Sequence, residues 1–140
     1  MTIDELEGRL ARLGDRALRY QYIVQLGRRL PPMPPDLKTP ENQVRGCMSA
    51  AWLAGELRGD DPQVLSFVGD SDSIIVKGLF AILAGVYNGQ TPEDALAVNL
   101  SDIFERLKLG EALSPNRRNG FYSMVEKIKR SARELATVRG

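Results

Sequence analysis

The residue best suited to covalent chemistry is Cys47, the single cysteine in a chain of 140 residues that contains no histidine. Without imidazole, the chain has no Cys-His or Ser-His couple and no histidine-ligated metal site. One thiol cannot close an intramolecular disulfide, so any group that it accepts must come from one partner and leave to another. The residue types therefore indicate a covalent carrier, although an isolated cysteine is often an inert, buried thiol.

The residues next to Cys47 favour the reactive alternative. Gly46 precedes the cysteine and Ser49 follows two positions later, so the thiol lies in a run of small residues. Glycine permits a tight or left-handed backbone, which would aim the thiol independently of the neighbouring strands. Loops held by a rigid scaffold are common places for reactive groups. We call the connection that holds Cys47, residues 46–48, the cysteine loop. Gly46 and Ser49 are therefore predicted to support the cysteine loop or to contact a partner.

The segments on either side of the loop are predicted to be strands. Their residues favour extended structure, and the sequence Gly59-Asp60-Asp61-Pro62 is a strong turn signal between the last two. The predicted strands cover residues 43–45, 49–57 and 64–68.

Helices are predicted on both sides of these strands, because apolar residues recur there at helical spacing. The predicted helices cover residues 3–13, 15–28, 74–87, 91–97 and 101–107, with a long last helix that begins at Ser114-Pro115. In the second of them, Leu18, Tyr22 and Leu26 are expected on one apolar stripe. Helices around about three strands define an α+β fold. The length and a hydrophobic fraction of 43% fit one domain over residues 1–140.

The net charge of +1 gives no electrostatic basis for binding nucleic acid. Basic residues nevertheless gather in the segment 115–140, either as a solvated helix face or as a docking face for an acidic partner. No run of 18 apolar residues predicts a membrane span. The acidic start of the chain does not resemble a signal peptide, so we expect a cytoplasmic protein whose thiol stays reduced.

Five strings of residues, spread in order along nearly the whole chain, carry a more specific signal together than any one of them alone. The strings are Tyr20-Gln21-Tyr22-Ile23-Val24-Gln25-Leu26-Gly27, Asn42-Gln43-Val44-Arg45-Gly46-Cys47-Met48-Ser49-Ala50-Ala51-Trp52, Gly69-Asp70-Ser71-Asp72, Val76-Lys77-Gly78-Leu79 and Leu113-Ser114-Pro115-Asn116-Arg117-Arg118-Asn119-Gly120. Together they resemble the SufE/CsdE family of sulfur-acceptor proteins, partners of cysteine desulfurases in iron–sulfur cluster assembly.

The resemblance implies a fold like that of the IscU scaffold, a small antiparallel sheet covered by helices, with the reactive cysteine on an edge loop. It also implies that Cys47 takes persulfide sulfur from a cysteine desulfurase of the SufS or CsdA kind and passes it to an iron–sulfur scaffold or another recipient. Pyridoxal phosphate is expected on the desulfurase, and no cofactor or metal is expected on this chain. With one cysteine, a monomer is not expected to assemble a cluster. The desulfurase system, the recipient and the oligomeric state stay open.

Two further residues are predicted to support the loop or to contact a partner. Asp72 is expected to cap the helix that follows it, and the same position could regulate the cysteine loop by holding it closed. Arg117 begins the last helix, where a cation opposes the helix dipole, so a pairing or docking role stands beside a plain surface role. The alternative function is a noncatalytic protein that modulates a desulfurase or scaffold by docking alone.

Overall fold

The sheet in the computed structural model, which describes residues 3–46 and 49–139, is an antiparallel hairpin of two strands. The strands are β1 (Ala51–Arg58) and β2 (Val64–Ser71). Every second residue of β2 is buried, and β1 begins with the same alternation. Because strand side chains alternate between the two faces, one face of the hairpin is covered by other elements.

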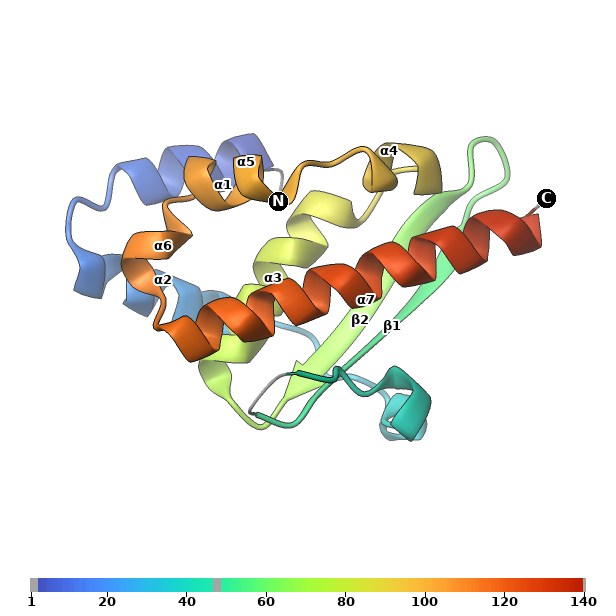
Figure 1. Cartoon of the computed structure of the whole chain (residues 1–140), viewed down its shortest axis with the longest axis horizontal. Helices are drawn as coiled ribbons and strands as arrows, with labels where there is room; N and C mark the ends of the chain where they lie inside the picture. The colour runs from blue at the N-terminus through green and yellow to red at the C-terminus, as the bar shows by residue number, and fades with distance from the viewer. Residues whose placement is uncertain (1–2, 47–48, 140) are drawn as a thin grey trace.

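Helices supply that cover, with α3 packed against β2 and α7 packed against β1 (Figure 1). The α-helices are α1 (Ile3–Ala11), α2 (Arg16–Arg28), α3 (Ile74–Tyr87), α4 (Pro92–Leu96), α5 (Leu100–Arg106), α6 (Leu109–Ala112) and α7 (Pro115–Arg139). Two short 3-10 helices, η1 (Pro35–Leu37) and η2 (Pro40–Asn42), lie in the segment between α2 and β1.

The apolar core lies where α3 and α7 meet the hairpin. Ile82 and Leu83 of α3 are fully buried, as are Phe121 and Val125 of α7. The apolar residues that recur at helical spacing along the last helix therefore include members of its buried face. This packing fixes the start of α7 and the start of α3 next to the same end of the hairpin.

Helices α2 and α3 touch through two glycines. A Cβ atom on Gly27 would lie 2.5 Å from the carbonyl oxygen of Ile74, and one on Gly78 would overlap the carbonyl of Ile23. Only glycine lets the two backbones approach this closely. The contact fixes the position of the first turns of α3, which follow directly on β2.

The α+β fold class is confirmed, and one predicted strand is not formed. Residues 43–45 make only an isolated bridge, in which Gln43 lies opposite Trp52. The sheet of the described residues therefore has two strands where about three were expected. The chain turns soon after this bridge, at Arg45 and Gly46, and Gly46 has a φ of +84°.

Two predictions about individual helices are wrong. The N-cap of α3 is Ser73, whose hydroxyl accepts from the N–H of Val76, and Asp72 precedes it. On α2, Leu18 is 48% exposed while Arg19 is buried. In the part of the chain that the structure describes, no helix is both long and apolar enough to cross a membrane.

Candidate functional site

The predicted reactive residue, Cys47, lies outside the described residues, together with Met48. The site is therefore built from the residues that flank them, Gly46 on one side and Ser49 on the other. Both flanks contact the first half of α7.

The flank before the cysteine is held by the shape of its backbone. Gly46 has a φ of +84°, in the left-handed region that side chains with a Cβ atom rarely adopt. A Cβ atom there would also lie 2.7 Å from the hydroxyl oxygen of Ser123 on α7. Glycine is thus required at this position both for its backbone conformation and for its close approach to a helix.

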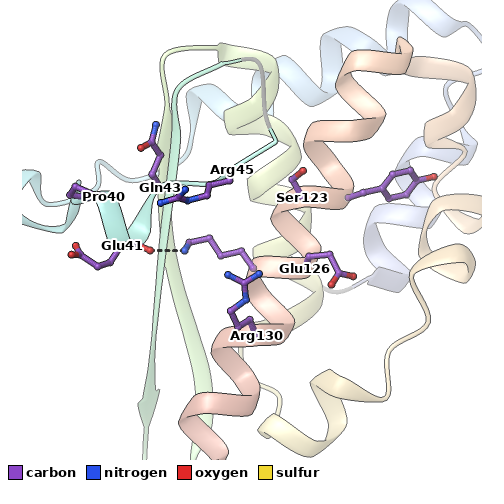
Figure 2. Close-up of a pocket in the computed structure, with 9 residues that line it drawn as sticks. Pro40, Glu41, Gln43, Arg45, Ser123, Glu126 and Arg130 are labelled. Carbon is purple, nitrogen blue, oxygen red and sulfur yellow. Dashed lines mark hydrogen bonds between the residues drawn. The ribbon is translucent and has the colours of Figure 1, made fainter.

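A cavity of about 440 Å³ opens beside this flank, between η2 and α7. Figure 2 shows Arg45 and Gln43 on one wall and Ser123 and Arg130 on the other. Ser123 therefore lines the cavity and also contacts Gly46, so the cavity begins where the cysteine loop begins.

The flank after the cysteine is held by a side chain that the sequence predicts. The Nη1 atom of Arg117 donates to the hydroxyl oxygen of Ser49 over 3.1 Å. Arg117 is itself fixed in the first turn of α7, where its N–H donates to the hydroxyl of Ser114. The guanidinium group of Arg117 is thus bonded to the side chain of Ser49, which lies two residues after Cys47 in the sequence.

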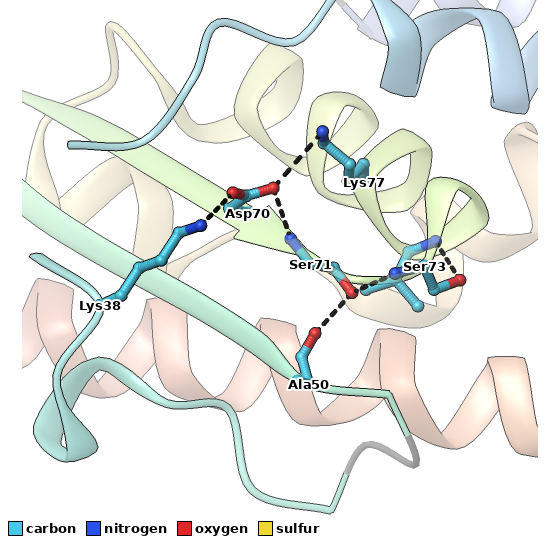
Figure 3. Close-up of polar contacts among 7 residues, drawn as sticks. Lys38, Ala50, Asp70, Ser71, Ser73 and Lys77 are labelled. Atoms are coloured by element: carbon cyan, nitrogen blue, oxygen red, sulfur yellow. Dashed lines mark hydrogen bonds and ion pairs between the residues drawn. The ribbon is translucent and has the colours of Figure 1, made fainter. Parts of the chain in front are cut away.

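The next residue, Ala50, is held at the end of the hairpin where Ala51 pairs with Ser71. Its carbonyl oxygen accepts from the hydroxyl of Ser71 over 2.6 Å and from the N–H of Asp72 over 3.1 Å. The same Ser71 hydroxyl accepts from the N–H of Ser73, the cap of α3 (Figure 3). Asp72 therefore reaches the cysteine loop through its backbone, and its side chain is exposed.

Asp70, next to Ser71, contacts three parts of the chain: the segment before η2, the end of β2 and helix α3. Its carboxylate pairs with Lys38 at 2.7 Å and with Lys77 at 3.4 Å, and it accepts from the N–H of Ser71 (Figure 3). Burial opposes ionisation of Asp70, but the hydrogen bond from Lys38, the backbone bond from Ser71 and the charges of both lysines outweigh it. The pKa of this carboxyl therefore lies below its ordinary value, and Asp70 stays ionised at neutral pH.

Residues 4–132 match the protein family described as SufE, Fe-S metabolism associated domain. The chain belongs to the SufE family. An uncharacterized SufE-like protein of Rhizobium etli is 38% identical over 136 residues, which cover 96% of this chain and 92% of that protein. A second uncharacterized SufE-like protein, from Rhizobium meliloti, is 39% identical over 133 residues, which cover 94% of each chain.

The fold of this SufE-family chain also occurs in a solved structure. The solution structure of a hypothetical protein from Thermus thermophilus has a TM-score of 0.76 to it, with 98% of this chain and 99% of the other covered. The two are 20% identical, so the likeness is one of fold. Family membership links the chain to iron–sulfur metabolism.

The predicted supporting residues of this SufE-family chain gather around the cysteine loop. Gly46 and Ser49 flank it, Arg117 bonds to Ser49, and the backbone of Asp72 bonds to Ala50. Sequence reasoning missed a second set, namely Ser123, Asp70, Ser71 and Lys38. The string Gly69-Asp70-Ser71-Asp72 was a signal for two of them, but it indicated a helix start and not a contact with the loop. Within the described ranges, no three Asp, Glu, Cys or His side chains form a group that could hold a metal ion.

Proposed function

We propose that this chain accepts sulfane sulfur from the persulfide of a cysteine desulfurase on Cys47 and passes it on for iron–sulfur cluster assembly. One observation carries the proposal: the single cysteine of a SufE-family chain follows Gly46 and precedes Ser49, and α7 contacts both. Two positioned flanks and an adjacent guanidinium group suit a thiol that must meet another protein's sulfur at a defined place.

The proposed reaction is a thiol exchange that needs no oxidant. The Cys47 thiol loses its proton, and the thiolate attacks the outer sulfur of the donor persulfide. A sulfur–sulfur bond forms at Cys47 while the sulfur–sulfur bond of the donor breaks, and the donor cysteine leaves as a thiolate that takes up a proton. The rate depends on the thiolate fraction, and free cysteine titrates near about 8.5. The hydrogen bond from Arg117 to Ser49 supports this proposal because it fixes a guanidinium group on the residue two positions after Cys47.

In this proposal residues 1–140 act as one domain in the cytoplasm, where a thiol stays reduced. The chain brings no cofactor, and pyridoxal phosphate belongs to the desulfurase. Because the chain has no second cysteine, the loaded sulfur cannot be discharged into an internal disulfide and leaves only to another molecule.

Intact mass spectrometry tests the proposal directly. After incubation with a cysteine desulfurase and free cysteine, we expect the chain to become heavier by one sulfur atom, and dithiothreitol to reverse the change. The Cys47→Ser variant is expected to stay at its original mass and to lose stimulation of the desulfurase. A serine variant that stimulates the desulfurase fully would instead establish the docking modulator. If the wild-type chain gains no sulfur while the desulfurase itself turns over, the proposal is wrong.

A further inference from the structure

The cavity between η2 and α7 is a cationic groove that ends at the cysteine loop. We propose that this groove binds an acidic segment of the protein that donates sulfur to Cys47. The inference rests on the proposed function, because it concerns the sulfur donor, and it adds a contact surface that the exchange chemistry does not require. The name cationic groove is used below for the cavity whose walls carry Arg45, Lys127 and Arg130.

Three positive charges share the groove. Lys127 and Arg130 lie one turn apart on α7, and Arg45 faces them from the opposite wall (Figure 2). Burial, and then the charge of Arg130, lower the pKa of Lys127 below its ordinary value. Arg45 acts in the same direction, against the opposing charge of Glu134. The cations are therefore close enough to repel one another, and an anion between them would relieve that repulsion.

The two carboxylates of the lining do not fill this role. Figure 2 shows the carboxylate of Glu41 pointing out of the groove while its backbone oxygen faces inward. That backbone oxygen accepts from the Nζ atom of Lys127 over 2.7 Å, so the lysine spans the groove from α7 to η2. The pKa of the Glu41 carboxyl is lowered by hydrogen bonds from its own backbone and from Thr39, which hold it on its own side. Glu126 also points away from Arg45 in this view.

The open shape of the groove favours a chain of carboxylates over a single small anion. Arg45 and Arg130 are exposed, and an exposed ion pair contributes little free energy in water. Several carboxylates on one segment bind together, so their small contributions add without a new loss of translational freedom. The basic residues of α7 thus provide the docking face for an acidic partner that the composition of residues 115–140 suggested.

The place of the groove indicates which partner it serves. Arg45 lies two residues before Cys47, and Ser123 lines the groove and contacts Gly46. A protein that brings its own persulfide to Cys47 must cover the neighbouring surface, and the cationic groove is part of that surface. An acidic segment seated there would orient the donor before the sulfur exchange begins.

Charge reversal with a matched control tests the groove. The variants are Arg130→Glu in the groove and Arg133→Glu, an exposed arginine of the same helix outside the lining. Both change the net charge equally, and both are made in the Cys47→Ser chain so that no sulfur moves. Binding of the source organism's cysteine desulfurase is measured by fluorescence anisotropy at low and high salt, with hexaglutamate or free glutamate as competitor at equal carboxylate concentration.

We expect Arg130→Glu to bind the desulfurase about fivefold more weakly than Arg133→Glu at low salt, with a smaller difference at high salt. Hexaglutamate is expected to compete far better than free glutamate. The proposal is wrong if the two variants bind the desulfurase equally well, or if free glutamate competes as well as hexaglutamate. It is also wrong if the Cys47→Ser chain does not bind the desulfurase at all. Sulfur loading of the wild-type chain is measured separately, so a chain that binds but is never loaded refutes the proposed function and leaves the groove standing.

Discussion

Replacing Gly46 by alanine is expected to slow the sulfur loading of Cys47 beyond what its effect on stability explains. The backbone at Gly46 has a φ of +84°, and a residue with a Cβ atom loses about 1–2 kcal/mol in the left-handed region. The new methyl group would also lie 2.7 Å from the hydroxyl of Ser123. Moving that hydroxyl away from its preferred rotamer costs about 1 kcal/mol more. The total is about 2–3 kcal/mol.

Gly89 provides a matched control for this substitution. Its φ is +86°, yet no atom lies within 4 Å of a Cβ atom built there. Gly89→Ala should therefore lose only the backbone contribution of about 1–2 kcal/mol. Adding Ser123→Ala to Gly46→Ala should recover about 1 kcal/mol, because the next contact is an ordinary one at 3.7 Å. Urea unfolding measures these free energies.

The loading rate separates a positioning role from a loss of stability. A displacement of the reactive group by an ångström slows a positioned reaction severely, so we expect Gly46→Ala to load at least about tenfold more slowly than Gly89→Ala. Mass spectrometry over time, with excess desulfurase, gives this rate at a temperature where both variants are folded. If the two variants load equally fast and unfold with equal free energies, then neither the left-handed backbone nor the Ser123 contact positions the loop.

Three further predictions, the first with a control substitution, concern helix packing, a buried hydroxyl and a partly buried carboxylate, and each is tested by urea unfolding. Gly78→Ala should destabilise the fold by about 3 kcal/mol or more, because its methyl group would overlap the carbonyl of Ile23. The control is Gly8→Ala, which has no atom within 4 Å of the new methyl group and should stabilise the fold by about 0.5–1 kcal/mol. Burial raises the pKa of Tyr87 to about 12 from 10.0, and its hydroxyl has no hydrogen-bond partner among the described residues. Tyr87→Phe should therefore be neutral or stabilising by up to about 1 kcal/mol, and should remove a loss of stability that the wild type shows as the pH rises from 10 to about 12. Asp70→Asn should be less stable than the wild type at neutral pH. The pKa of Asp70 is lowered from 3.8 by folding, so the wild type should lose stability as the pH falls below 3.8, and the variant should lose less. A wild type that is as stable at acid pH as at neutral pH would contradict this prediction.

The helix boundaries could be predicted from the sequence where the signal is local. Asp15 caps α2 and Thr91 caps α4 through their own side chains, at the positions that the sequence indicates. The cap of α3 could not be assigned in this way, because Asp72 and Ser73 are both good caps. Hydrogen bonds to Ser71 and Ala50 decide between them, and these come from residues brought together by the hairpin.

The apolar stripe predicted on α2 is right at Leu26, which is buried, and wrong at Leu18, which is 48% exposed. Leu18 fits an apolar stripe, but Gly27 and Ile23 contact α3, and Arg19 is buried on the same face of the helix as they are. The Nε atom of Arg19 donates to the carbonyl oxygen of Leu13 over 2.9 Å, which satisfies part of its buried guanidinium group. Periodicity counts apolar residues, whereas this face is determined by where a glycine permits backbone contact.

In the candidate site too, local sequence signals can be predicted, whereas contacts between distant parts of the chain cannot. Cys47 can be proposed as the reactive residue because thiol chemistry belongs to the residue type and a glycine adjoins it. Its supports come from far along the chain: the bond from Arg117 to Ser49 joins residues 68 positions apart. Nothing in the local sequence of Ser123 indicates that Gly46 will lie against it, since that contact exists only once α7 packs on β1. A reactive thiol can thus be proposed from composition, while the contacts of the residues that flank it depend on the packing of a helix that begins 68 residues later.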